Sequence, residues 1–307
     1  MDLALIRTFL EVAATGSFGA AAERLFVTQS AVSLRVQRLE DQLGLPLFTR
    51  SKAGAELTPA GREFEPFALS LIQTWQKARQ QVAIPEGFNR SLTVGAQYSI
   101  WPRLGFAWVD ALRAEIPDLS LRVEVGMPDR LTRMLVEGYV QTALMYSPTL
   151  RPGLRIARVM DDELILCASW PGATLADLPG RYAFVDWGPE FVSQHALDFP
   201  GLTNPGLTLA LGSLTADFLI GRKMAAYLPG AAALRAIEAG QLHPVDSAPV
   251  YPYPVWSVWR EDVDPALIDQ AAGLLASVAV TIDRATQGVM ESFHLHLRQF
   301  SAHKHEY

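Results

Sequence analysis

A chain of 307 residues that is half apolar and only 19% charged is long enough for two or three ordinary domains, and this composition excludes a disordered protein. The net charge of −6 does not suggest a nucleic-acid partner, although residues 1–62 hold seven of the 26 Lys and Arg but only six of the 32 Asp and Glu. The single cysteine excludes an internal disulfide framework, and we find neither a signal peptide nor an apolar run of the roughly 20 residues that span a bilayer. We therefore expect a cytoplasmic protein.

Two short helices are predicted at the start of the chain. Apolar residues recur at helical spacing over residues 3–14, which indicates an amphipathic helix: Ile6, Phe9, Leu10 and Ala13. Gly16 is suited to end this helix, and the Ser17 hydroxyl is suited to cap the next one, which runs to Leu25.

A third helix is predicted from Gln29 to about Leu43, with Thr28 as its N-cap. Apolar residues at positions i, i+4, i+7 and i+11 are expected to face the core: Val32, Val36, Leu39 and Leu43. Polar side chains project from the other side: Gln29, Ser30, Ser33 and Gln37. This layout is typical of the helix-turn-helix, whose second helix enters the major groove of DNA. On its own, the polar row is equally compatible with a merely solvated helix face.

A β-hairpin is predicted directly after the third helix. Residues 47–52 are expected to form a strand, residues 53–54 a turn, and residues 56–57 the return strand. Arg50 and Lys52 are two residues apart and therefore point to the same side of the hairpin. Two cations on one edge of a small wing suit DNA phosphates or a narrow minor groove.

The ordered set of residues between positions 20 and 61 resembles the signature of the LysR-type transcriptional regulators. Its elements are Ala20-Ala21, Leu25, Thr28-Gln29-Ser30-Ala31-Val32-Ser33, Leu39-Glu40, Leu43-Gly44, Leu47-Phe48-x-Arg50 and Gly54-x-x-Leu57-Thr58-x-Ala60-Gly61. The continuation to residues 75–79 is also similar to the regulators of flagellar master operons within that family. The resemblance implies a sequence-specific DNA-binding transcriptional regulator, not an enzyme, with double-stranded operator DNA as its partner.

The resemblance also implies which residues contact DNA. The family's base-reading positions fall on Gln29, Ser30 and Ser33, with backbone contacts from Arg50 and Lys52. Many members carry Pro where Ser30 stands and Arg where Leu34 stands. Leu34 cannot donate to guanine, but it can touch a thymine methyl group. The full set of expected DNA-binding residues is Thr28, Gln29, Ser30, Ser33, Leu34, Gln37, Arg38, Arg50 and Lys52.

A long linker helix is predicted over residues 59–85, with Thr58 as its cap and Pro59 at its first position. Apolar residues alternate in it at spacings of four and three, as in a heptad seam: Phe64, Ala68, Leu71, Trp75, Ala78 and Val82. Such a stripe can cover the protein's own core, but a lone helix between two domains has little core to cover. We therefore expect it to pair with another copy, and the resemblance implies a dimer or homotetramer built on it.

From Ser91 onward strands and helices alternate, which predicts an α/β fold. Strands are expected at residues 92–95, 119–125, 142–145, 164–168, 182–185 and 207–211, and helices at 101–116, 128–137 and 266–285. A second lobe is expected to begin near Glu163, and the chain is expected to return to the first lobe near Asp264. Two such lobes resemble the periplasmic-binding-protein-like effector domain of LysR regulators.

The predicted organisation is therefore α/β with a helix-rich N-terminal domain. A winged helix-turn-helix occupies residues 1–58, the linker helix residues 59–85, and the effector domain residues 91–307. Lobe I takes residues 91–162 and 265–307, and lobe II residues 163–264.

An effector site is predicted between the lobes, because ligands of open α/β sheets bind beyond the carboxyl ends of strands, against helix N-termini. Its expected residues are Gln97, Tyr98, Ser99, Trp101, Met127, Tyr146, Asp186 and Trp187. Ser99 matches the family's position for a hydroxyl that holds an effector carboxylate, although it is also suited to cap the following helix. The aromatic and Met side chains are each as compatible with a core role. Since Asp186 disfavours a second anion and can pair with an amine, we expect a small organic acid, either a monocarboxylate or an amino-acid-like compound.

No catalytic, metal-binding or cofactor-binding motif is found in the sequence, so no cofactor is expected. Cys167 falls in an apolar strand, where an inert, buried role is expected, and the remaining clustered candidates suit a polar tail: His294, His296, His303 and His305. Two alternatives stay open, namely a nucleoid-type or constitutive DNA-binding repressor without a ligand, and an enzyme with an operator-binding head. If the protein activates transcription, RNA polymerase is a further expected partner.

Overall fold

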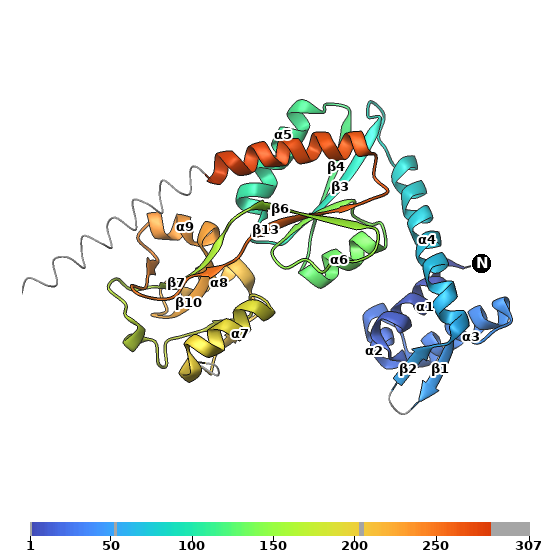
Figure 1. Ribbon diagram of the computed structural model, residues 1–307, viewed down its shortest axis with the longest axis horizontal. Coiled ribbons are helices and arrows are strands. Elements are labelled where there is room, and N and C mark those ends of the chain that lie inside the picture. Colours follow the sequence, from blue (N-terminus) through green and yellow to red (C-terminus); the bar gives the residue numbers. More distant parts are fainter. Residues whose placement is uncertain (1, 52–53, 203–205, 284–307) are drawn as a thin grey trace, which may run out of the picture. The chain divides into compact units, whose positions relative to one another are not determined.

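The computed structural model describes residues 2–51, 54–202 and 206–283, without the side chains of Arg50 and Ser51 (Figure 1). Contacts between residues divide the chain into two units. The first is Met1–Glu86 with Val136–Tyr139, and the second is Gly87–Leu135 with Val140–Tyr307. Buried apolar residues form a separate core in each unit.

The first unit begins with the helices α1 (Leu3–Thr15), α2 (Phe18–Leu25) and α3 (Gln29–Leu43). Each begins at a side chain that accepts a hydrogen bond from a backbone N–H of the first turn: Asp2, Ser17 and Thr28. Gly16 and Gly44 end α1 and α3 in the left-handed conformation. The structure thus confirms these helices and the predicted caps.

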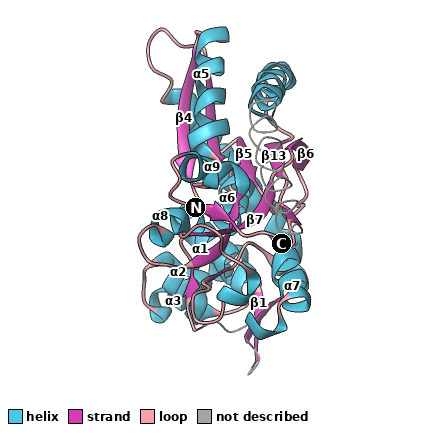
Figure 2. Cartoon of the chain, turned by 90° about the vertical axis from the view of Figure 1, so that its left-hand side faces the viewer, coloured by secondary structure: helices cyan, strands magenta, loops and turns pink. Residues whose placement is uncertain are grey.

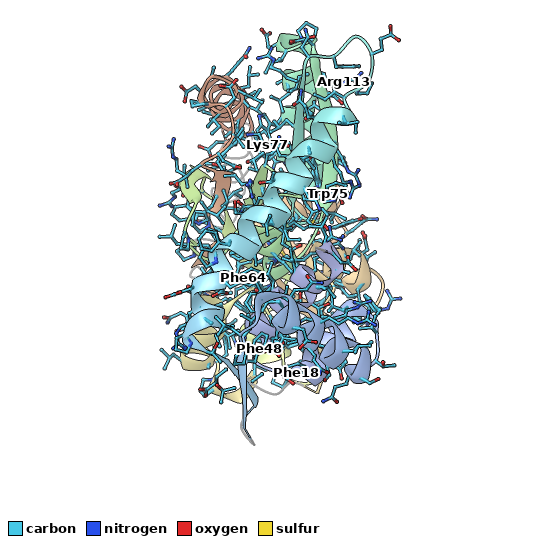
Figure 3. All side chains as sticks on the ribbon, turned by 90° about the vertical axis from the view of Figure 1, so that its right-hand side faces the viewer. Phe18, Phe48, Phe64, Trp75, Lys77 and Arg113 are labelled. Atoms are coloured by element: carbon cyan, nitrogen blue, oxygen red, sulfur yellow. The ribbon has the colours of Figure 1, made fainter. Side chains whose placement is uncertain are left out.

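Aromatic side chains join the helices of this unit to the hairpin that follows them. The Phe9 ring centroid lies 5.3 Å from that of Phe48 and 5.2 Å from that of Phe64, and Phe18 lies 5.7 Å from Phe48 (Figure 3). Most of the α3 residues predicted to face the core are buried: Val32, Val36 and Leu39. Leu43 is 41% exposed, so its predicted core position is wrong, because it lies in the last turn of α3, beyond the part that packs.

The strands β1 (Phe48–Ser51) and β2 (Gly54–Leu57) form the predicted antiparallel hairpin. Glu40 ties it to α3, because its Oε1 accepts from the backbone N–H groups of Leu47 at 2.7 Å and Phe48 at 3.2 Å. Ala55 donates its N–H to the Gly16 carbonyl at 2.7 Å, which attaches β2 to the end of α1. The base of the wing is therefore fixed on both sides.

Two glycines of the sequence motif stand where backbones approach each other closely. Gly54 has a φ of +133° and lies against the Gly16 carbonyl, whereas Gly61, in the first turn of α4 (Pro59–Val82), lies against the Leu47 carbonyl. A Cβ at either position would overlap the carbonyl oxygen. Glycine at these two positions therefore allows the hairpin to pack between α1 and α4.

The helix α4 packs in part on the core of its own unit. The residues that do so lie in its first half: Phe64, Ala68, Leu71 and Ile72. Trp75 (labelled in Figure 3) and Val82 are 46% and 87% exposed. The expectation that this helix has little core to cover is therefore wrong for its first half, and pairing with another copy stays a prediction for its exposed second half.

The second unit contains a sheet with the strand order β4-β3-β5-β13-β6. Its strands are β3 (Arg90–Ala96), β4 (Leu119–Val125), β5 (Thr142–Met145), β6 (Leu154–Met160) and β13 (Val255–Arg260). The strand β3 is parallel to β4 and β5, whereas β13 is antiparallel to β5 and β6. Because β13 belongs to this sheet, the chain returns to it at Val255, earlier than the return expected near Asp264.

Helices cover both faces of this sheet. On one face, Trp108 of α5 (Phe106–Glu115) donates its Nε1–H to the Ala271 carbonyl at 2.9 Å and lies 6.0 Å from Trp259 of β13. On the other face, Leu131 of α6 (Pro128–Val136) packs on Gly95 of β3. Figure 2 shows α5 alongside β4. The predicted helix at residues 101–116 is divided, since it begins as the π-helix η1 (Trp101–Gly105).

The helix Pro265–Asp283 is long and apolar enough to cross a membrane, by length and composition alone. This differs from the expectation that no such segment exists. One face of the helix is buried in the core of the second unit: Leu267, Ile268, Ala271, Leu275 and Ala279. A core helix of a soluble protein meets the same criterion of length and composition, and the buried stripe together with the bond from Trp108 fits that role.

A second sheet is built around β7 (Glu163–Ala168), which pairs antiparallel with β10 (Ala225–Pro229), β11 (His243–Pro244) and β12 (Tyr251–Pro252). Its helices are α7 (Pro189–Asp198), α8 (Thr215–Leu219) and α9 (Gly230–Glu238). The strands expected at residues 182–185 and 207–211 shrink to the parallel pair β8 (Phe184–Val185) and β9 (Thr208–Leu209). Cys167 is buried in β7, and burial raises the pKa of its thiol to about 12.

Candidate functional sites

The exposed face of α3 carries the residues predicted to read DNA. Two adjacent rows at i, i+4 and i+8 run along it: Gln29, Ser33 and Gln37, and Ser30, Leu34 and Arg38. Ser33 is half-buried and the others are exposed, whereas Val32, Val36 and Leu39 point into the core. The packing of α3 therefore presents the predicted residues together on one surface.

The start of α3 is held in place by its cap. The Thr28 hydroxyl accepts from the Ala31 N–H at 3.2 Å and lies 2.9 Å from the Ser30 hydroxyl. This rigid first turn presents the amide of Gln29, which can bind the N6/N7 edge of adenine, beside the apolar Leu34, which can contact a thymine methyl. Arg38 lies two turns further along and suits a phosphate.

The two wing cations are not located by the structure. The backbone of Arg50 lies in β1 opposite Ala55, but its side chain is not described, and Lys52 lies outside the described residues. Their predicted contacts with phosphates stay a prediction.

In the second unit, predicted site residues from two strand ends of the first sheet meet. The Gln97 side-chain carbonyl accepts the backbone N–H of Tyr146 at 2.8 Å, and the Ser99 hydroxyl hydrogen-bonds to the Tyr146 phenol. The helix η1 begins at Ile100 with no side-chain cap. The alternative role of Ser99 as a helix cap is therefore wrong, and its hydroxyl belongs to the Tyr146 network.

This network continues into the second sheet through a residue that the sequence did not identify. Tyr146 donates its hydroxyl to Asp162 Oδ2 at 3.4 Å, in the crossover between β6 and β7. Asp162 Oδ1 accepts from the backbone N–H groups of Glu163 at 2.9 Å and of Ala231, in the first turn of α9, at 3.2 Å. Asp162 thus connects the end of β5 to the start of α9.

An aromatic cluster surrounds the same junction. The Tyr146 ring stacks on that of Tyr253 with centroids 3.9 Å apart, and Trp187 meets Tyr253 at 5.7 Å in an edge-on arrangement. Trp187 is fixed by its Nε1–H, which donates to the Tyr227 carbonyl at 2.9 Å. The apolar faces of three rings therefore lie next to the hydroxyl and carboxylate groups of the network.

Burial dominates the electrostatics of the junction. It raises the pKa of Asp162 from 3.8 to about 6, although the backbone N–H groups, the Tyr146 hydroxyl and the positive charge of Arg103 all lower it. Burial and the nearby Asp162 charge raise the pKa of Tyr146 well above its usual value, so its phenol stays protonated and can donate. A carboxylate, a phenol and a guanidinium thus share one partly desolvated region.

The other predicted effector residues make no printed contact with this network within the described chain. Trp101 is buried and stacks on Phe106 with centroids 5.9 Å apart, whereas Tyr98 and Met127 are exposed. Asp186 is exposed and accepts the Gly188 N–H at 2.9 Å, and its charge contributes to the raised pKa of Tyr253.

Sequence reasoning missed Asp162, Tyr253 and Arg103. Asp162 and Tyr253 lie in the two crossovers between the sheets, where no periodic pattern marks a role, and Arg103 lies within a predicted helix. No group of three or more His, Cys, Asp or Glu within residues 2–51, 54–202 and 206–283 could hold a metal ion. The clustered histidines at positions 294, 296, 303 and 305 lie outside these ranges.

Comparison with protein families gives two matches. Residues 3–62 match the bacterial regulatory helix-turn-helix proteins of the lysR family, and residues 85–279 match the LysR substrate binding domain. The chain is also 33% identical over 268 residues to the HTH-type transcriptional regulator HdfR of Salmonella newport (strain SL254), which covers 86% of this chain and 94% of HdfR. These relatives are regulators of transcription and not enzymes.

Solved structures show the same fold. Full-length LysG of Corynebacterium glutamicum with bound effector Arg has a TM-score of 0.53 at 18% identity, covering 92% of this chain and 99% of LysG. The H2O2-bound OxyR of the same organism has a TM-score of 0.52 at 22% identity, covering 94% of this chain and 95% of OxyR. At these identities the likeness extends to the fold alone.

Proposed function

We propose a specific role for this chain, which belongs to the LysR family of bacterial helix-turn-helix transcriptional regulators: it reads one operator sequence and responds to a small-molecule effector. The observation that carries the first part is the exposed double row on α3, held by the Thr28 cap and backed by buried Val32 and Val36. Gln29, Ser30, Ser33, Leu34 and Gln37 read bases in this proposal. Thr28, Arg38, Arg50 and Lys52 position the backbone.

Selection of bound sequences from random duplex DNA tests this role. We expect one enriched motif, and Gln29→Ala should cost about 1–3 kcal/mol on the best site while relaxing preference at one position. Asp2→Ala, which changes a cap on another helix, serves as the control. A protein that enriches no motif would instead fit a nucleoid-type repressor and would contradict the proposal.

The effector site in this proposal lies at the junction between the two sheets of the second unit. The support is the chain of hydrogen bonds from Ser99 through Tyr146 to Asp162, flanked by Trp187 and Tyr253. A carboxylate can be held by Ser99 and Arg103, and an amine by Asp162 or Asp186. An amino-acid-like effector or a monocarboxylate suits both groups, and the solved LysG carries a bound Arg.

A thermal-shift screen of amino acids and small monocarboxylates tests the site. A hit should raise the unfolding temperature of the wild type and lose most of its effect in Ser99→Ala, whereas Ser120→Ala, at the other end of the first sheet, should respond like the wild type. A hit unaffected by Ser99→Ala would remove Ser99 from the site.

The remaining assignments follow from the same role. The winged helix-turn-helix takes residues 1–58, the linker helix residues 59–85 and the effector domain residues 91–307. Copies pair through the exposed half of α4 into a dimer, and two dimers form a homotetramer. The protein acts in the cytoplasm, and RNA polymerase is a further partner if the regulator is an activator.

A further inference from the structure

Phe26, in the turn between α2 and α3, is the most exposed large apolar side chain in the described part of the chain, at 95%. Most exposed apolar residues need no explanation, since surfaces contain many of them. Phe26 differs from those because its backbone is also unfavourable. It has a φ of 54° and a ψ of 43°, in the left-handed region that bulky residues rarely adopt.

The backbone of Phe26 is nevertheless firmly held. As the C-cap of α2 it donates its N–H to the carbonyls of Ala22 and Glu23, and the next residue, Val27, donates to Ala22 at 3.0 Å. Gly or Asn would satisfy the same geometry with less strain. The position therefore presents an aromatic ring to solvent at a cost to stability, which suggests that the ring has a partner.

The place of Phe26 indicates what that partner is. It lies two residues before Thr28, the cap of α3, and so borders the surface that carries Gln29 and Ser30. The turn residues 26–28 carry no charge, and the nearby Arg24 is engaged by Glu11 at 3.1 Å. The turn is therefore poorly suited to bind phosphate, and an apolar contact is the chemistry that it can offer.

We propose that Phe26 packs against an apolar surface of the operator duplex, either a thymine methyl group or deoxyribose carbons, when α3 enters the major groove. This inference rests on the proposed function of α3. Phenylalanine contacts thymine methyl groups in the major groove, and such a contact adds affinity without neutralising a phosphate. Phe26 is thus a further DNA-contacting residue, beyond the polar rows of α3.

The test compares full-length wild type, Phe26→Asn and Leu45→Asn on the operator obtained by selection from random DNA. Asn tolerates the left-handed backbone, so Phe26→Asn should unfold at the same or a higher temperature than the wild type. We expect Phe26→Asn to bind the operator about tenfold more weakly with an unchanged salt dependence. Leu45→Asn removes another exposed apolar side chain, just after the far end of α3, and should bind like the wild type.

A scan that replaces each operator thymine by uracil distinguishes the two surfaces. If Phe26 contacts a methyl group, the wild type loses affinity at one or two positions where Phe26→Asn loses none. If it contacts deoxyribose, Phe26→Asn binds every operator variant more weakly by the same factor. Equal operator affinity of Phe26→Asn and wild type would overturn the inference, including the case in which only transcription is impaired, which would indicate a protein partner. A wild type that selects no motif would overturn the proposed function as well.

Discussion

The Tyr146 hydroxyl donates to the Asp162 carboxylate at 3.4 Å, and this bond links the end of β5 in the first sheet to the crossover into the second. The same carboxylate accepts from the first turn of α9, which packs on the second sheet. A change in the angle between the two sheets would therefore alter these bonds. An effector that binds here can favour one arrangement only by binding it better than the other.

Asp162 gives the second unit a pH-dependent stability. Its folded pKa of about 6 lies above the unfolded value of 3.8, so its contribution to stability is complete below pH 4 and is lost as the pH rises through 6. Asp162→Asn resembles the protonated form and should unfold at a higher temperature than the wild type at pH 8, by about 1–2 kcal/mol in stability. The gain should vanish near pH 4.5. Thermal unfolding across this range measures it, with the exposed Asp161→Asn as control, and a gain independent of pH would contradict the assignment.

Gly61 and Gly19 form a matched pair of glycine substitutions. Gly61→Ala places a Cβ on the Leu47 carbonyl oxygen and should destabilise the first unit by about 1–3 kcal/mol. Gly19→Ala places its Cβ 3.7 Å from the Ser17 hydroxyl in α2, where ordinary contact is possible, and should stabilise by about 0.5–1 kcal/mol. Urea unfolding followed by circular dichroism checks both. Equal effects of the two changes would show that the hairpin does not pack closely on α4.

The exposed half of α4 predicts how copies associate. Trp75→Glu combined with Val82→Glu puts two charges on exposed apolar positions of the helix and should reduce the mass of the assembly to that of a monomer. Light scattering measures the mass. Leu150→Glu, at another exposed apolar position, should leave the assembly intact. An undiminished mass in the double variant would remove this half of α4 from the interface.

Arg50 and Gln29 should differ in how they bind DNA. Arg50→Ala should weaken binding to all sequences alike and reduce the slope of log affinity against log salt by about one, because a phosphate contact releases a counterion. Gln29→Ala should leave that slope unchanged and relax the base preference. Titrations at several salt concentrations on operator and random duplexes separate the two effects. A changed sequence preference in Arg50→Ala with an unaltered slope would contradict the assignment.

The local structure of the first sixty residues could be predicted because it depends on neighbours in the sequence. The hydroxyls of Ser17, Thr28 and Thr58 cap helices that begin within three residues of them, and the spacing of Val32, Val36 and Leu39 determines which face of α3 is buried. The exposed row containing Gln29 and Ser33 follows from the same periodicity. These features need only backbone geometry and the alternation of polar and apolar residues.

Other features depended on tertiary contacts. Leu71 continues an apolar seam, but only the position of the neighbouring helices shows that it packs on its own core while Trp75 does not. Asp162 has no pattern around it, and it meets Tyr146 and Ala231 only because β7 pairs with β10 and brings the start of α9 to the crossover. Its raised pKa follows from the burial that this meeting creates. Periodicity indicates which side of an element is covered, whereas contacts between distant segments decide what covers it and what chemistry results.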